Sequence, residues 1–111
     1  MATGSSDHSV RLWDAQTGAV VRVLQGHKGT VWSVAWRPGG RLLATGACDS
    51  TVRLWEVATG DLAAVITVAA MIVIYCVAWS PCGELVFAGG DGVVRIHRVT
   101  EDELQYNKVH L

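Results

Sequence analysis

The chain repeats part of its own sequence, and this internal repeat restricts the possible folds more than any other feature. Residues 2–18, ATGSSDHSVRLWDAQTG, align with residues 44–60, ATGACDSTVRLWEVATG, and ten of the seventeen positions are identical. Residues 34–40, VAWRPGG, and 77–83, VAWSPCG, form a second matching pair, and a more divergent third copy occupies 88–102, AGGDGVVRIHRVTED. A repeat with a period of about 40–45 residues indicates that one small unit of secondary structure is stacked several times.

Short apolar runs separated by turn residues make up most of each repeat. The turns RPGG and SPCG place Pro where φ is preset and Gly where a positive φ is needed. Short runs spaced by about 8–12 residues are typical of an all-β fold, and no stretch shows a sustained helical period. The predicted strands are 2–5, 9–14, 20–24, 31–36, 41–46, 51–57, 62–67, 74–79, 84–88, 92–97 and 104–109.

Composition and charge argue against several classes of function. The formal net charge is −1 and the nine Lys and Arg residues are scattered, so no basic patch indicates nucleic acid or a membrane surface as a partner. Half of the residues are hydrophobic, which is too many for a disordered tail. Cys48, Cys76 and Cys82 form no CxxC pair, and the first ten residues lack the apolar core of a signal peptide. We interpret the cysteines as reduced thiols and predict an intracellular protein, cytoplasmic or nuclear.

Residues 62–79, LAAVITVAAMIVIYCVAW, allow two interpretations. The segment is eighteen residues long and carries no charge, which by length and hydropathy alone is compatible with a membrane-spanning helix. The preceding repeat, however, places two strands and a polar loop, residues 19–36, at the same position. The β-branched content of the segment also favours strands. We predict two strands, and we expect the uncharged run to promote aggregation.

A repeat of this length that holds four short strands and closes on Leu-Trp-Asp or Leu-Trp-Glu resembles the WD-repeat family of β-propellers. The resemblance extends over essentially the whole chain. The first copy has Asp7 and Trp13-Asp14, and the third keeps Trp79, Pro81, Gly83 and Asp91 but has His97 at the Trp position. The middle copy matches at Gly26-His27, Val34-Ala35-Trp36, Pro38-Gly39-Gly40, Leu43-Ala44-Thr45-Gly46, Asp49 and Val52-Arg53-Leu54-Trp55-Glu56.

The resemblance implies an all-β fold of four-stranded antiparallel blades that stack around a channel, each blade burying its faces against its neighbours. The chain holds about two and two-thirds repeats, so we expect an open arc, an incomplete propeller. The expected blades are 2–25, which lacks its first strand, 26–68, and a degenerate third blade at 69–111. Three origins stay open: a fragment of a larger propeller protein, a short chain that completes a propeller by assembly, and a non-functional remnant.

Four residues of the middle copy look like a hydrolase constellation on paper: His27, Thr45, Asp49 and Trp55. The resemblance implies instead a structural hydrogen-bond network, in which the entry-loop histidine links the hydroxyl, the carboxylate and the indole. We therefore predict no catalytic residue and no enzymatic activity. The first copy has Thr3, Asp7 and Trp13 at the matching positions, and the third keeps only Asp91, with Ala70, Ala88 and His97 at the others.

The sequence indicates no metal site and no cofactor. The spacings of His8, His27, His97 and His110 match no zinc pattern, and the phosphate-binding patterns GxxxxGK[ST] and GxGxxG are absent. The resemblance makes other proteins the expected partners. Further blades, from the same or another chain, would be needed to close the propeller.

The resemblance also implies where a partner protein would bind: the face formed by the blade-entry loops and the turn before the third strand. The matching residues are Thr30, Trp32 and Cys48 in the middle copy, Val73, Tyr75 and Gly90 in the third, and Ser6 in the first. Trp32 and Tyr75 are aromatic residues, a type that dominates interface energies. The alternative is that both rings only pack against the channel mouth or the next strand.

A protein-interaction scaffold is the function that the resemblance favours. A substrate receptor of a cullin-type ubiquitin ligase is the alternative. Such receptors often carry Trp-Asp-x-Arg, whereas the corresponding residues here are Trp13-Asp14-Ala15-Gln16 and Trp55-Glu56-Val57-Ala58. Lipid binding through an Arg-Arg pair has no support, because no such pair occurs.

Overall fold

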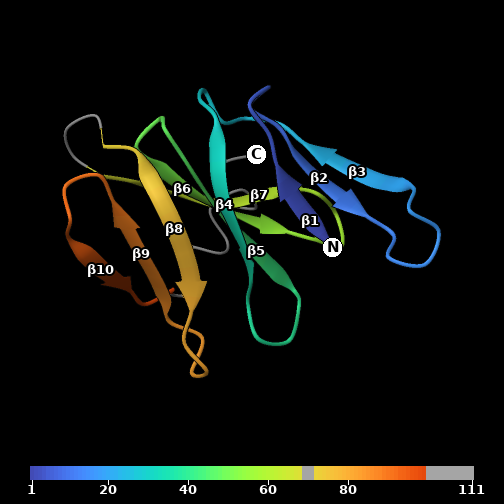
Figure 1. The fold of residues 1–111 in the computed structure, drawn as a ribbon. Coiled ribbons are helices and arrows are strands. Elements are labelled where there is room, and N and C mark those ends of the chain that lie inside the picture. Colours follow the sequence, from blue (N-terminus) through green and yellow to red (C-terminus); the bar gives the residue numbers. More distant parts are fainter. Residues whose placement is uncertain (69–71, 100–111) are drawn as a thin grey trace.

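Three antiparallel β-sheets stand side by side in the computed structural model, which describes residues 1–68 and 72–99 (Figure 1). Over these residues the chain forms ten strands and no helix. The sheets contain three, four and three strands, and their order follows the sequence. The predicted class, antiparallel blades in an open arc, is confirmed.

Each predicted strand that falls within the described residues forms, and its ends lie within two residues of the prediction. The predicted strand 104–109 lies outside the described residues. The first sheet contains β1 (Ala2–Gly4), β2 (Val10–Trp13) and β3 (Val20–Leu24). The middle sheet contains β4 (Val31–Trp36), β5 (Leu42–Ala47), β6 (Thr51–Glu56) and β7 (Leu62–Thr67). The third sheet contains β8 (Ile74–Trp79), β9 (Leu85–Gly89) and β10 (Val94–His97).

The strand registers reproduce the sequence repeat residue by residue. Thr3 pairs with Arg11 between β1 and β2, and Thr45 pairs with Arg53 between β5 and β6. The third sheet continues the series with Phe87 opposite Arg95. A shift of 42 positions therefore relates the paired residues of these strands in the three sheets, and this equivalence allows their side chains to be compared directly.

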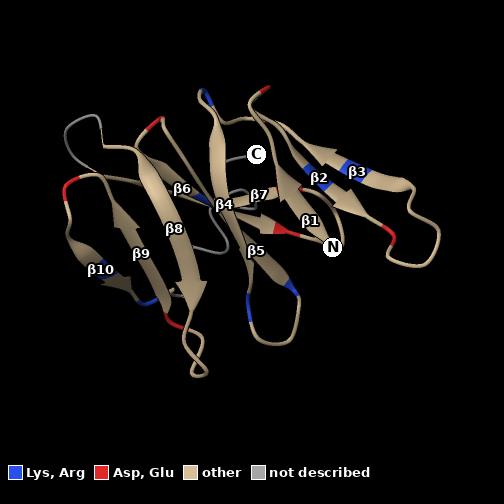
Figure 2. Cartoon of the chain, in the orientation of Figure 1, with Lys and Arg blue, Asp and Glu red and all other residues tan. Residues whose placement is uncertain are grey.

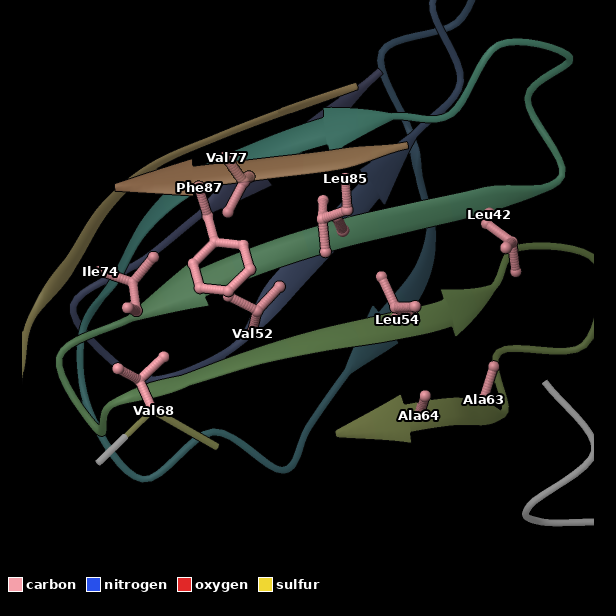
Figure 3. Packing of buried hydrophobic residues seen from close by; sticks show 11 residues of the cluster. Leu42, Val52, Leu54, Ala63, Ala64, Val68, Ile74, Val77, Leu85 and Phe87 are labelled. Atoms are coloured by element: carbon pink, nitrogen blue, oxygen red, sulfur yellow. The ribbon is translucent and has the colours of Figure 1, made fainter. Parts of the chain in front are cut away.

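Two apolar cores hold the sheets together, one on each face of the middle sheet. The core between the first and middle sheets contains Val10, Leu12, Leu24, Val31, Leu43, Ala47 and Trp55. The core between the middle and third sheets contains Leu42, Ala44, Val52, Leu54, Ala63, Ala64, Val68, Ile74, Val77, Leu85 and Phe87 (Figure 3). Every residue of β5 is buried as a result, whereas β10 alternates between exposed and half-buried residues.

The uncharged segment 62–79 supplies two strands that belong to different sheets. Its first part forms β7 at the outer edge of the middle sheet, and its last part forms β8 in the third sheet. The strand interpretation is therefore the one that the fold supports. No helix among residues 1–68 and 72–99 has the length and apolar character needed to cross a membrane.

Strands β4 and β8 lie next to each other and carry no charged residue, whereas charges occur in the turns and on other strands of all three sheets (Figure 2). Two hydrogen bonds join β4 and β8. The Val77 backbone N–H donates to Ser33 Oγ at 3.1 Å. The Trp79 indole donates to the Ala35 carbonyl oxygen at 3.0 Å. These bonds fix the position of the third sheet relative to the middle one.

Candidate interaction surface and hydrogen-bond network

The four network residues of the middle sheet come together in one chain of hydrogen bonds. His27 Nδ1 lies 3.0 Å from Asp49 Oδ2, and His27 Nε2 lies 2.6 Å from Thr45 Oγ1. The Trp55 indole donates to the same Thr45 oxygen at 2.9 Å. His27, Thr45 and Trp55 are buried. The network is therefore shielded from solvent where it passes through the sheet.

The chemistry of the donors determines where the proton of the histidine lies. An ionised carboxylate only accepts, so Nδ1 of His27 carries the ring proton and donates to Asp49. In the neutral ring Nε2 then accepts from the Thr45 hydroxyl, whose oxygen accepts from the Trp55 indole N–H. Each of the four groups is satisfied with the histidine neutral.

Burial and hydrogen bonding determine the charges of the network. Burial lowers the pKa of His27 below its ordinary value of 6.5, although Asp49 acts in the opposite direction. For Asp49, burial raises the pKa, but hydrogen bonds from Thr51, the Lys28 backbone N–H and His27 outweigh it and lower the pKa to about 2. At neutral pH the pair is a neutral imidazole beside a carboxylate, which fits a structural role.

Thr51 belongs to the network, although the sequence analysis did not include it. Its hydroxyl donates to Asp49 Oδ1 at 2.6 Å, and its backbone N–H donates to the same oxygen at 3.0 Å. The same geometry occurs in the first sheet, where Ser9 donates to Asp7 through its hydroxyl at 2.6 Å and its N–H at 3.1 Å. The recurring pattern Asp-x-Ser/Thr was the sequence signal for this contact.

The first sheet contains an equivalent but incomplete set of these contacts. The Trp13 indole donates to Thr3 Oγ1 at 2.9 Å, as Trp55 does to Thr45. Asp7 accepts from Arg11 Nη2 at 3.1 Å, and the Ser9 hydroxyl, followed by the Ser9 N–H, holds the pKa of Asp7 well below its usual range. The predicted residues Thr3, Asp7 and Trp13 thus form two separate contacts and not one chain.

The third sheet corrects one assignment made from the sequence. Val34 of β4 pairs with Thr45, whereas the equivalent Val77 of β8 pairs with Phe87. Phe87, and not Ala88, therefore occupies the threonine position. The reason is that five residues separate the paired Trp79 and Leu85, whereas six separate Trp36 and Leu43. Ala70 lies outside the described residues.

Asp91 keeps its turn position but has a different side-chain partner. It accepts from Arg95 Nη2 at 2.6 Å and from the Val93 backbone N–H at 3.1 Å. The bond from Arg95 is the main reason why the pKa of Asp91 is lowered. His97 takes the position of Trp55, because it pairs with Leu85 as Trp55 pairs with Leu43.

The predicted aromatic pair lies on the two adjacent uncharged strands. Trp32 is on β4 and Tyr75 on β8, and their rings meet edge to face with centroids 5.8 Å apart. Trp32 and Tyr75 are 56% and 54% exposed, and neither belongs to the two apolar cores. Burial in a core therefore does not account for them.

The other predicted surface residues surround this pair. The Thr30 N–H donates to Cys48 Sγ at 3.1 Å, and the Cys48 N–H donates to the Thr30 carbonyl at 3.0 Å. The Val73 carbonyl accepts from the Gly90 N–H at 3.0 Å, and a Cβ added at Gly90 would lie 3.6 Å from the Tyr75 ring. Cys48 is exposed, whereas Thr30 and Val73 are half-buried.

The profile of the family described as WD domain, G-beta repeat (WD40), matches residues 1–14, 18–56 and 67–98. The chain belongs to the WD40 repeat family. The family profile begins its second unit before β3, whereas the sheets are made of β1–β3, β4–β7 and β8–β10.

Individual WD40 proteins resemble the chain over about one repeat. Coronin-7 of Mus musculus is 50% identical over 44 residues, which are 40% of this chain and 5% of that protein. Ribosome assembly protein 4 of Chaetomium thermophilum is 44% identical over 43 residues, 39% of this chain and 8% of that protein. The chain thus spans only a small part of the length of these relatives.

A solved structure resembles nearly the whole fold. The crystal structure of the WD40 β-propeller domain of Doa1 superposes with a TM-score of 0.82 at 30% sequence identity. The match covers 92% of this chain and 34% of that chain. The three sheets are therefore arranged as consecutive blades of a WD40 propeller. In the described part of the chain, His, Cys, Asp and Glu residues form no cluster of three that could hold a metal ion.

Proposed function

We propose that the chain is a protein-interaction scaffold and that its WD40 blades bind partner proteins around Trp32 and Tyr75. The observation that carries the proposal is the exposed aromatic pair, whose rings are in contact on two adjacent blades. Aromatic residues are enriched among the few residues that carry most of the binding energy of interfaces. A large apolar pair kept at the surface is best explained by a partner that covers it.

The surroundings of the pair support a protein as the partner. Strands β4 and β8 carry no charge, so the surface lacks the basic character of a nucleic-acid interface. The hydrogen bonds from Trp79 and Val77 to β4 hold the two blades together and thus fix the distance between the two rings. A preformed aromatic surface of this kind loses little conformational entropy on binding.

The proposal places the protein inside the cell, in the cytoplasm or nucleus, and assigns it no catalysis and no cofactor. Cys48, Cys76 and Cys82 are free and exposed, which suits a reducing compartment. The blades form an open arc, so further blades, from the same or another chain, complete the propeller in the functional state.

Substitution of each aromatic residue tests the proposal. Trp32→Ala and Tyr75→Ala should abolish the capture of partner proteins from a cell lysate, while thermal unfolding stays close to that of the native chain. Trp36→Ala is the matched control, because Trp36 lies on the same strand and is 38% exposed. Unchanged capture in both variants, or a loss of capture that follows a loss of stability, would show that the rings only support the fold.

A further inference from the structure

The two exposed aromatic residues occupy β-bulges at equivalent places of neighbouring blades. The residue-by-residue pairing of β4 with β5 skips Trp32, and the pairing of β8 with β9 skips Tyr75. A bulge leaves its extra residue without a partner in the ladder and re-aims that side chain. The backbone itself therefore places both rings at the surface, in the middle of a chain segment that both neighbouring sheets support.

The polar atoms of the two rings have no partner within the described part of the chain. The indole N–H groups of Trp13, Trp55 and Trp79 each donate to an oxygen of the chain. The Trp32 indole and the Tyr75 hydroxyl, in contrast, form no hydrogen bond with residues 1–68 or 72–99. A partner that covers the rings must supply an acceptor for each group, because a buried donor without an acceptor costs free energy.

The charges of the adjoining turns argue against a charged group over the rings. The turn carboxylates are each already bonded to an arginine or a histidine: Asp7 to Arg11, Asp49 to His27 and Asp91 to Arg95. Lys28 of the entry loop is exposed, and strands β4 and β8 carry no charge. A cationic ligand group would find no free carboxylate in these turns. The segment that fits on the rings is therefore uncharged and apolar, and it offers acceptors.

The conformation of the partner segment follows from the same requirements. The carbonyl oxygens inside a helix are bonded within that helix. Addition of a β-strand needs a regular edge, which the two bulges interrupt. A polyproline II segment has no internal hydrogen bonds, so all of its carbonyl oxygens can accept. Its proline rings pack on aromatic side chains, and proline has no N–H group that the contact would leave without an acceptor.

We infer that the partner segment bound by Trp32 and Tyr75 is a neutral, proline-rich stretch in the polyproline II conformation. Its carbonyl oxygens accept from the Trp32 indole and the Tyr75 hydroxyl, and its proline rings pack on the two aromatic rings. The inference rests on the proposed function and specifies the class of partner sequence. Because both the rings and the proline-rich segment are preformed, little conformational entropy is lost on binding.

Three dye-labelled peptides of equal length test the inference by fluorescence anisotropy: decaproline, a glycine-serine decapeptide, and the same glycine-serine peptide with one central lysine. The native chain should bind decaproline with saturation and the other two about tenfold more weakly. A chain that binds decaproline no better than the glycine-serine peptide, or that prefers the lysine peptide, would overturn the inference. The proposed function would survive that result if capture of partners from lysate still depended on both rings, so the two failures are distinguishable.

Conservative variants then test the two hydrogen bonds. Trp32→Phe and Tyr75→Phe each keep a ring and remove one donor, so each should weaken decaproline binding about 2- to 10-fold. Trp36→Phe is the matched control and should bind like the native chain, because Trp36 lies on the same strand but outside the bulge, where it pairs with Leu43. Equal binding by all three variants would contradict the inference. Far-ultraviolet circular dichroism checks the fold, and either donor variant alone suffices for the comparison with Trp36→Phe.

Discussion

Where the middle sheet buries the hydroxyl of Thr45, the third sheet buries the ring of Phe87. Both residues occupy the same register position, opposite Arg53 and Arg95 respectively. Thr45 accepts from Trp55 and donates to His27, whereas Phe87 joins the apolar core between the sheets. A blade of this family therefore tolerates either a complete polar network or an apolar residue at this position.

The turn aspartates differ in the same way. Asp7 and Asp91 each accept from an arginine four residues later, but Asp49 accepts from His27. Arg53, the equivalent arginine of the middle sheet, has a buried Nε with no hydrogen-bond partner among the described residues. In the middle sheet, His27 thus makes the contact to the turn carboxylate that an arginine makes in the other two sheets.

In the buried part of the fold the network is either complete, as in the middle sheet, or replaced by an apolar residue, as in the third sheet, whereas the partial network of the first sheet includes an exposed Thr3. A buried hydroxyl or indole without a partner costs about 1–3 kcal/mol, whereas replacement of the partners by apolar groups of suitable shape is nearly neutral. The third sheet has Phe87 and His97 at the positions of Thr45 and Trp55, so no hydroxyl remains at the network position. We therefore expect partial loss of the network to be costly where the site is buried.

The largest loss of stability is expected when Phe87, which occupies the threonine position of the third sheet, is truncated. Phe87→Ala should lower the free energy of unfolding by about 3–5 kcal/mol, because it removes a buried ring between two sheets. Urea unfolding followed by tryptophan fluorescence, at one fixed chain concentration, measures the change. Val86→Ala is the control, since Val86 is the adjacent, half-buried residue. A loss below about 1 kcal/mol would show that Phe87 does not replace the network energetically.

In the middle sheet, removal of His27 from the hydrogen-bond network should lower the stability of the fold. His27→Ala should lower the free energy of unfolding by about 1–3 kcal/mol, because Thr45 and Asp49 lose a partner. The same urea measurement applies, with Thr30→Ala in the same loop as control. A change within experimental error would mean that the network contributes nothing to the stability of the middle blade.

The strands and sheets could be predicted from the sequence. The period of the repeat predicted the strands and the antiparallel sheets, because spacing and turn residues carry that information locally. The residue at the threonine position of the third sheet was predicted wrongly as Ala88. The sequence has one residue fewer between Trp79 and Asp91 than between Trp36 and Asp49. The strand register places this deletion in the turn before β9, so that Phe87 and not Ala88 matches Thr45.

The sequence also did not predict the contacts between sheets. Arg37 lies over the Trp79 ring, 5.4 Å from its centroid, and Arg22 of β3 donates to the carbonyls of Thr59 and Ala58 in the turn between β6 and β7. Such contacts depend on the angle between neighbouring blades, which no local pattern encodes. The exposure of Trp32 and Tyr75 likewise depends on how β4 and β8 are placed.

The stability of the fold should decrease at acidic pH, because His27 of the middle sheet is neutral in the folded chain. The pKa of His27 lies below its ordinary value of 6.5, so the unfolded chain takes up this proton first as the pH falls. The stability contributed by His27 is therefore complete above about pH 7 and decreases as the pH falls below 6.5. Urea unfolding at about pH 7 and about pH 5 should show that the difference between the native chain and His27→Ala shrinks. An equal difference at both values would contradict a neutral His27.

Asp49 should produce a second loss of stability at lower pH. Its pKa is about 2 in the folded chain, against an ordinary value of 3.8. The contribution of the ionised carboxylate is present above 3.8 and disappears as the pH falls toward 2. Asp49→Asn should weaken this acid-induced loss relative to the native chain.

The smallest loss of stability is expected when Arg95 is replaced. Arg95 contacts Asp91 in the third sheet, as His27 contacts Asp49 in the middle sheet. Arg95 and Asp91 form an ion pair at 2.6 Å, but both side chains are partly exposed, and surface pairs add little because water and salt screen them. Arg95→Ala should therefore shift the urea midpoint less than His27→Ala does. The shift should disappear at about 1 M NaCl, where the screening length is only about 3 Å, whereas the effect of His27→Ala should persist because its bonds are buried. Equal salt sensitivity of the two variants would mean that the middle and third sheets hold their turn aspartates by the same kind of contact.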